Sequence, residues 1–335
     1  MTYKHSYFRG GSKQAGVFTV LVLVLQTLLT ACSGLHKEEP AAVIKENAHS
    51  GGSVVAFSQS GDLLASGGWE GTLRVWQMPE GREIRHWPAH SDSVNGIAFL
   101  DSDRVIVTAG YDGVLARRAI DGQLLQQVRT ASPVTHMVAD SKTDRLLTGH
   151  VDGSVRLWKA EDFTLLQEQQ LHHAAVKAVA IAPGAARYAS SSADGSVVLW
   201  SDGVLPRQLD TPPADAWTLE FSPDGKSLSG ASWFRLYQWE LADGSLTTIA
   251  TEHRGIIKSI QYINEGRELA TISRQTDSSV YFLDAESGEV RRRFQRHDLC
   301  GGDIAVSPRG RYLATTSDDA SVRFWLLESD DEKSE

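Results

Sequence analysis

The sequence predicts an all-β fold, in which seven similar units of four short strands close into a ring. One observation is a recurring hairpin: an apolar strand, a tight turn and an alternating strand ending in Trp, at 64–76, 146–158, 188–200 and 313–325. A second is a repeat of about 40 to 45 residues, which is typical of the blades of a β-propeller. This repeat is marked by His49, His90, Thr130, His172, Pro212, His253 and His297. A third is an extra strand before the first unit.

The amino-terminal segment has the pattern of a secretory signal. Residues 1–14 contain Lys4, Arg9 and Lys13 and no acid, and residues 15–30 are apolar. A basic region followed by an apolar run is typical of a signal that is removed after export. The run is shorter than the ~18–20 residues of a spanning helix, although an uncleaved membrane anchor remains the alternative.

The end of this segment, Leu29-Thr30-Ala31-Cys32, resembles the lipobox of bacterial lipoproteins. The resemblance implies that residues 1–31 are a lipoprotein signal peptide and that Cys32 becomes acylated, for example with palmitate. Several acyl chains anchor a protein more firmly than one. Ser33 follows Cys32, which by the same resemblance implies a lipid-anchored protein of the bacterial cell envelope, in the outer membrane and facing the periplasm. The inner membrane remains the alternative.

Charge and cysteine content exclude some classes of function. The formal net charge is −9, and removal of the leader would take away three cations and no acid. Nucleic-acid binding depends on a basic surface, so we expect no nucleic-acid partner. If Cys32 is acylated, Cys300 has no internal disulfide partner. Cys300 is then a small buried residue or a reactive thiol.

The remaining segments define the domain boundaries. Residues 32–40 are expected to form the acylated Cys and a short polar linker, and residues 41–327 the propeller. Residues 42–46, AVIKE, precede the first unit, whereas the last unit lacks a fourth strand. We therefore expect this segment to join the seventh blade as its outer strand and to close the ring. Residues 328–335 form an acidic tail that we expect to be disordered.

These hairpins and marker His residues resemble the WD40 repeat family over roughly 41–327. The Trp-Asp ending of that family is incomplete here. No Asp follows the Trp at Trp76, Trp158, Trp200, Trp239 or Trp325. Arg118 replaces the Trp in the second unit, and Leu283-Asp284 keeps only the Asp. The resemblance implies a seven-bladed propeller that binds proteins.

The resemblance also implies structural tetrads of His, a hydroxyl, Asp and Trp in two blades. A satisfied buried network of this kind holds the turn against the sheet. In the first blade Glu70 replaces the turn Asp and Gly68 stands at the hydroxyl position. A protease triad is the alternative, but no pattern suggests an oxyanion hole, so we assign no catalytic residue. The two predicted tetrads are His172, Ser192, Asp194 and Trp200, and His297, Ser317, Asp319 and Trp325.

Partner binding is expected on the face that carries the turns before the Trp strands, which we call the top face. Exposed aromatic side chains are favoured as interface anchors. The candidates are Trp69, Tyr111, Trp233 and Phe234, although they can instead pack on neighbouring loops. The basic run RRRFQRH, residues 291–297, is either an edge strand protected by charge or a docking site.

We therefore predict a membrane-anchored, periplasm-facing scaffold, a monomeric propeller that binds partner proteins through its top face. No metal cluster or phosphate loop is visible, so we expect no metal and no cofactor. The alternative is a propeller enzyme or small-ligand binder that uses the central channel, including a quinone-cofactor relative. The inner strands contain few carboxylates or His residues, as in KAVAIA at 177–182 and KSIQYI at 258–263. This composition favours the scaffold over the enzyme.

Overall fold

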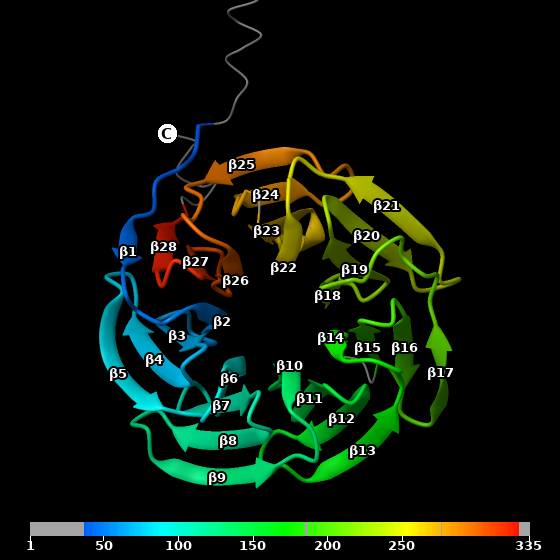
Figure 1. The fold of residues 1–335 in the computed structure, drawn as a ribbon, viewed down its shortest axis with the longest axis horizontal. Coiled ribbons are helices and arrows are strands. Elements are labelled where there is room, and N and C mark those ends of the chain that lie inside the picture. The colour runs from blue at the N-terminus through cyan, green and yellow to red at the C-terminus, as the bar shows by residue number, and fades with distance from the viewer. Residues whose placement is uncertain (1–36, 185–186, 276, 328–335) are drawn as a thin grey trace, which may run out of the picture. The chain divides into compact units, whose positions relative to one another are not determined.

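The computed structural model describes residues 37–184, 187–275 and 277–327. The chain divides into two units, residues 1–37 and 38–335, and only Lys37 of the first unit is described. The second unit contains seven antiparallel sheets of four strands, arranged around one axis (Figure 1). The predicted seven-bladed β-propeller is thus confirmed.

Blades 1 to 6 are four-stranded meanders that begin beside the axis and run outward. Blades 1 to 3 consist of β2 (Gly52–Phe57), β3 (Leu63–Gly68), β4 (Thr72–Gln77) and β5 (Arg82–Pro88); β6 (Val94–Leu100), β7 (Val105–Gly110), β8 (Val114–Ala119) and β9 (Leu124–Arg129); and β10 (Val134–Asp140), β11 (Arg145–His150), β12 (Ser154–Lys159) and β13 (Leu165–Gln170). Blades 4 and 5 consist of β14 (Val176–Ile181), β15 (Arg187–Ser192), β16 (Val197–Ser201) and β17 (Val204–Gln208), and of β18 (Thr218–Phe221), β19 (Ser227–Ser232), β20 (Arg235–Glu240) and β21 (Leu246–Ala250).

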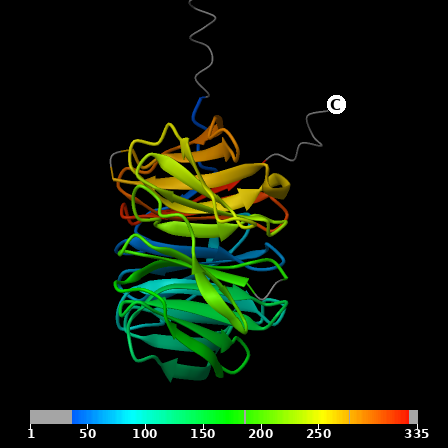
Figure 2. The ribbon, with the colours of Figure 1, turned by 90° about the vertical axis from the view of Figure 1, so that its right-hand side faces the viewer.

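The last two blades lie on either side of the seam. Blade 6 consists of β22 (Ile256–Ile263), β23 (Glu268–Arg274), β24 (Val280–Asp284) and β25 (Val290–Phe294), with the short 3-10 helix η1 (Asn264–Gly266) between its first two strands. Blade 7 consists of β26 (Gly301–Val306), β27 (Tyr312–Ser317), β28 (Val322–Leu326) and β1 (Val43–Lys45). Figure 2 shows the ring from the side, where the turns between strands lie along its two faces.

The core lies between neighbouring blades. The Trp that ends the third strand faces an apolar residue of the second strand, as in the register pairs Leu64↔Trp76 and Leu313↔Trp325. Trp76 in turn packs edge-on against Phe324 of blade 7, at 6.1 Å between ring centroids. Each blade therefore completes the core of the next, which is why repeats of this kind are stable only as a closed array.

The amino-terminal strand closes the ring as predicted. β1 pairs antiparallel with β28, with Val43 opposite Phe324 and Lys45 opposite Val322. The structure adds a second contact, because Glu39 forms a parallel bridge to Phe294 of blade 6. The Glu39 carbonyl also accepts the Trp325 indole N–H at 3.1 Å. Part of the segment expected to be a linker thus crosses the seam between blades 6 and 7.

Several predictions fall outside the described residues. They are the signal peptide at 1–31, acylation of Cys32, and the acidic tail at 328–335. Across the part of the chain that is described, no helix has the length and apolar character needed to cross a membrane.

Candidate functional site

The top-face loops are fixed by buried networks, but the hydroxyl partner of each His is not the predicted one. His172 Nε2 lies 2.7 Å from Ser190 Oγ, and His297 Nε2 lies 2.7 Å from Thr315 Oγ1. The prediction of Ser192 and Ser317 was wrong by two residues. Strand residues i and i+2 share a face, so both candidates point toward the His loop.

The predicted hydroxyls have another structural role. Ser192 Oγ donates to the Ala174 carbonyl, and Ser317 Oγ donates to the Cys300 carbonyl, each at 3.0 Å. Both therefore bond to the backbone of the top loop. The His ring instead bonds to the hydroxyl two residues earlier in the strand, which is Ser190 or Thr315.

The predicted link to the Trp indole is also absent in these two blades. Trp325 donates to the Glu39 carbonyl, and Trp200 Nε1 has no hydrogen-bond partner among the described residues.

A complete tetrad occurs in blade 1, where it was not expected. His49 bonds to Ser66 at 2.8 Å and to Glu70 at 2.8 Å, and Trp76 Nε1 donates to Ser66 at 2.9 Å. The sequence signal for the hydroxyl is a Ser or Thr ten residues before the Trp.

The protonation states of the His and Asp members suit such a network: the His ring is neutral and the Asp is ionised. Burial lowers the pKa of His172, which favours the neutral ring. Burial opposes ionisation of Asp194, but hydrogen bonds from Ser196 and the His173 backbone outweigh it and lower the pKa to about 2. Ser190 and Thr315 have no solvent-exposed surface. These groups can hold a turn in place, but no substrate reaches their hydroxyls.

The aromatic candidates on the top face are exposed. Trp69 and Tyr111 occupy equivalent turns of blades 1 and 2, and their backbone N–H groups donate to Gly51 and Ser93. Each keeps an exposed fraction above 40%, with Trp69 at 45% and Tyr111 at 42%. The Trp69 indole also lies against Gly51, where a Cβ would approach ring atoms to 2.8 Å. The ring is thus supported on one side and open on the other.

Blade 5 displays two adjacent aromatic rings. Trp233 and Phe234 form its turn, with ring centroids 5.5 Å apart and exposed fractions of 39% and 44%. Phe234 has φ of 60°, in the left-handed region, at a turn position occupied by Gly71 in blade 1. Non-glycine residues in this region are strained and cluster at binding sites. The turn therefore holds Phe234 in a conformation that its side chain disfavours.

The mouth of the central channel lies inside this aromatic rim. The register of the first two strands shifts at the same point in blades 1, 2, 3, 4 and 6. A bulge re-aims a side chain and is frequent beside binding sites. The residues at the shifts in blades 2, 3, 4 and 6 are Asn95, Thr135, Lys177 and Lys258.

Two lysines flank one indole ring at the mouth. Lys177 Nζ lies 3.4 Å and Lys258 Nζ lies 5.5 Å from the centroid of Trp217, which precedes β18. Lys258, His136, Asp303 and Arg274 line a pocket of about 170 Å³ together with Trp69 and Trp217. The prediction missed this group because it counted acids and His residues on the inner strands. The signal was the Lys at the start of both KAVAIA and KSIQYI.

Below the mouth, the channel widens into a cavity of about 750 Å³ lined by all seven inner strands. Glu220 and Asp303 are acids of this lining, and each has a backbone partner. Glu220 accepts the Tyr262 N–H at 3.0 Å, and Asp303 accepts the Val55 N–H at 3.0 Å. Burial raises the pKa of Glu220 to about 8. Both acids thus tie neighbouring blades together.

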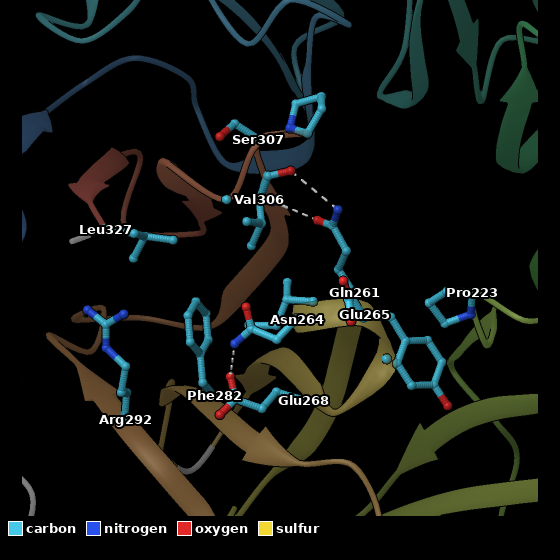
Figure 3. Close-up of a pocket in the computed structure, with 15 residues that line it drawn as sticks. Pro223, Gln261, Asn264, Glu265, Glu268, Phe282, Arg292, Val306, Ser307 and Leu327 are labelled. Carbon is cyan, nitrogen blue, oxygen red and sulfur yellow. Dashed lines mark hydrogen bonds between the residues drawn. The ribbon is translucent and has the colours of Figure 1, made fainter. Parts of the chain in front are cut away.

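A separate pocket of about 350 Å³ opens beside η1 (Figure 3). Several of its polar side chains are bonded to the protein itself. Gln261 accepts the Val306 N–H at 2.6 Å and donates to the Val306 carbonyl at 3.3 Å, and Asn264 donates to Glu268. These groups have little hydrogen-bonding capacity left for a ligand.

Three arginines of the basic run at 291–297 are paired with acids. Arg291 pairs with Asp284 at 2.9 Å, Arg292 pairs with Glu39 at 2.6 Å, and Arg293 pairs with Glu252. This arrangement favours the edge-strand interpretation over a docking site. Cys300 is half-buried and has a free thiol. Within the described ranges, no three His, Cys, Asp or Glu side chains are placed to hold a metal ion.

Comparison with known proteins identifies a family of repeats in this chain. The family described as "WD domain, G-beta repeat" matches residues 42–77, 81–116, 122–159, 163–201 and 288–325, which together make up more than half of the chain. Human Striatin-4 is 26% identical over 276 residues, covering 72% of this chain and 36% of its own length. Mouse Cilia- and flagella-associated protein 52 is 23% identical, covering 76% of this chain and 42% of its own length. The chain therefore corresponds to only part of these relatives.

Proposed function

Because the chain belongs to the WD40 repeat family, we propose that it is a membrane-anchored scaffold that faces the periplasm and binds partner proteins through the top face of its propeller. The observation that carries the proposal is the set of exposed aromatic side chains on that face, Trp69, Tyr111, Trp233 and Phe234. Large exposed aromatic groups are costly in water and act as anchors when a partner covers them.

The anchoring part of this proposal rests on Cys32 and its lipobox-like context. Acyl chains on Cys32 would hold the propeller at a membrane, and Cys300 would remain as a free thiol. Cys32→Ser should abolish acylation and release the chain from washed membranes, as measured by fractionation and by the mass of the mature protein. If the variant stays in the membrane fraction, the anchor lies elsewhere.

The binding part is tested by removing two rim aromatics. In Trp69→Ala/Tyr111→Ala, partner proteins that co-purify with the full chain from detergent-solubilised membranes should be lost. The melting temperature should change little, because neither ring belongs to the buried core. The control is Leu205→Ala, which truncates an exposed apolar side chain on the outer strand β17 instead. If the rim variant retains its partners, the top face is not the binding surface.

A ligand or substrate in the central channel is the second candidate function. The cavity of about 750 Å³ is large enough for a small molecule. Glu220 and Asp303, acids of its described lining, bond to backbone N–H groups of neighbouring strands, which favours a structural role. We therefore place binding at the rim and mouth ahead of catalysis within the channel.

A further inference from the structure

Lys258 is placed at the channel mouth without a hydrogen-bonded acceptor. Its ammonium makes no hydrogen bond or close ion pair with any residue that the structure describes, and Trp217 is its ring neighbour at 5.5 Å. An ammonium group has three donors, and donors withdrawn from water without acceptors are unfavourable. Burial lowers the pKa of Lys258, and the charge of Asp303 opposes that effect without a hydrogen bond between the two groups. Lys258 therefore favours a ligand that brings an acceptor.

His136 supplies a second donor to the same pocket. Its Nδ1 accepts the Val179 N–H at 3.2 Å, so Nε2 carries the hydrogen of the neutral ring. Burial, with the charge of Lys258, lowers its pKa to about 4, and the ring stays neutral at pH 7. Nε2 has no hydrogen-bond partner among the described residues, and the ring lines the pocket. The pocket thus offers an N–H donor beside the ammonium.

The other charges at the mouth are already engaged. Lys177 pairs with Asp215 at 3.5 Å, and Arg274 pairs with Asp318 at 3.0 Å. Asp303 accepts two backbone N–H groups, from Val55 at 3.0 Å and Ile304 at 2.9 Å. The charge of Asp303 attracts Lys258, but the hydrogen bonds of Asp303 go to the backbone, so the donors of Lys258 and His136 have no acceptor among the described residues.

The size and walls of the pocket limit what can enter. Its volume of about 170 Å³ suits one short side chain rather than a large cofactor, and Trp69 and Trp217 form apolar walls. Carboxylate oxygens accept charge-assisted hydrogen bonds from a cation and an N–H donor at once. We propose that the channel mouth binds the carboxylate of an Asp or Glu side chain in an acidic segment of the partner. This inference rests on the proposed top-face function and specifies the chemistry of the partner.

The test uses capped hexapeptides and the purified full chain. The probe is acetyl-hexaglutamate amide, the matched neutral peptide is acetyl-hexaglutamine amide, and citrate is the free carboxylate. Binding is measured by calorimetry and by tryptophan fluorescence, because Trp217 lies beside Lys258. The variants are Lys258→Gln and, as the matched control, Lys226→Gln, which removes an exposed lysine in the turn between β18 and β19.

We expect the glutamate peptide to bind more tightly than the glutamine peptide and than citrate. Lys258→Gln should weaken it by about tenfold or more, whereas Lys226→Gln should not change it. Equal binding of the two peptides, or full affinity in Lys258→Gln, would overturn the inference. Citrate binding as tight as that of the peptide would assign the mouth to a small anion instead.

A second measurement on the wild-type chain does not depend on the folding of a variant. The glutamate peptide should protect Lys258, but not Lys226, from acetylation by an N-hydroxysuccinimide ester, as read by mass spectrometry. Unchanged labelling of Lys258 would overturn the inference. Partner capture that requires Trp69 and Tyr111 but persists in Lys258→Gln would overturn it too, while the proposed function would stand. Capture that is indifferent to the rim aromatics would count against the proposed function itself.

Discussion

Single buried hydroxyl groups hold the top loops of this propeller. In blade 1, Ser66 bonds to both His49 and Trp76, and in blade 3, Thr148 bonds to His150 and Trp158. In blade 3 the His lies on the strand instead of the loop, yet the hydroxyl and the indole keep the same positions. The hydroxyl is therefore the common centre of these networks, and the His can reach it from either side.

Removal of one such hydroxyl should be costly. Ser66→Ala leaves a ring nitrogen of His49 and the indole N–H of Trp76 without a partner in a buried site. We expect the free energy of unfolding to fall by about 2 kcal/mol or more. Urea unfolding measures the loss.

The matched control is Ser50→Ala. Ser50 is exposed and bonds to Glu70, another member of the same network. An exposed hydrogen bond contributes little, so the control should stay close to the wild type. If the two variants lose equal stability, Ser66 is not the centre of the network.

Because of Glu220, we expect part of the folding stability to fall as the pH rises, which is the opposite of the effect of an ordinary ion-paired carboxyl. Burial raises its pKa from 4.5 to about 8, so within that window the folded chain keeps a proton that the unfolded chain releases. Stability contributed by this group therefore falls as the pH rises from about 4.5 to 8. Glu220→Gln should remove that loss, a gain of up to about 1.4 kcal/mol per pH unit.

Urea unfolding at a series of pH values tests this prediction. Glu240→Gln removes an exposed acid at the end of β20 and serves as the control. The stability difference between Glu220→Gln and the wild type should widen with pH, whereas that of the control should stay flat. A pH-independent difference for Glu220→Gln would show that this carboxyl ionises normally in the folded chain.

The residue-level predictions from sequence succeeded only in part, for a physical reason. The repeat period identified the loop His residues. It did not show which of two hydroxyls on the same face of a strand forms the hydrogen bond with the His ring. Ser190 and Ser192 share that face, and only the geometry selects Ser190. Lys177 and Lys258 were visible as sequence letters, but the bulges that re-aim them depend on the pairing of whole strands.

At the scale of elements, the seam is the part of the ring that depends on two distant segments. β1 supplies the fourth strand of blade 7, and Glu39 bridges to β25 of blade 6. The strand itself could be predicted, because the last repeat lacked a partner for its third strand. The Glu39 contact could not be predicted, since a single parallel bridge leaves no pattern in the sequence.

A proline at the start of this segment tests the closure. The Ala42 N–H donates to the Phe324 carbonyl of β28 at 2.8 Å, and the Ala42 side chain is exposed. Ala42→Pro removes this donor from the seam and should lower stability by roughly 1–2 kcal/mol. Ala42→Thr keeps the backbone N–H at the same position and should have little effect. Equal thermal stability of the two variants would mean that β1 does not close the ring.

At the scale of the whole molecule, the residues that stabilise the ring are distinct from the residues exposed on its top loops. The inter-blade core and the closed seam hold seven top loops in fixed positions, since each blade packs on both neighbours. The period predicted this architecture because it recurs from blade to blade, and the extra strand predicted how the ring closes. The binding surface is less predictable, because it depends on side chains that differ from blade to blade.

The most direct test of the scaffold proposal is site-specific crosslinking in membranes of the native host. A photoreactive amino acid would replace Trp69, Tyr111 or Phe234 on the top face, with Arg309 in the turn between β26 and β27 on the opposite face as the control. Captured proteins would be identified by mass spectrometry. We predict one recurrent protein from all three top-face positions and none from Arg309. Capture from Arg309 alone, or lipid and scattered proteins from every position, would contradict a partner-binding top face.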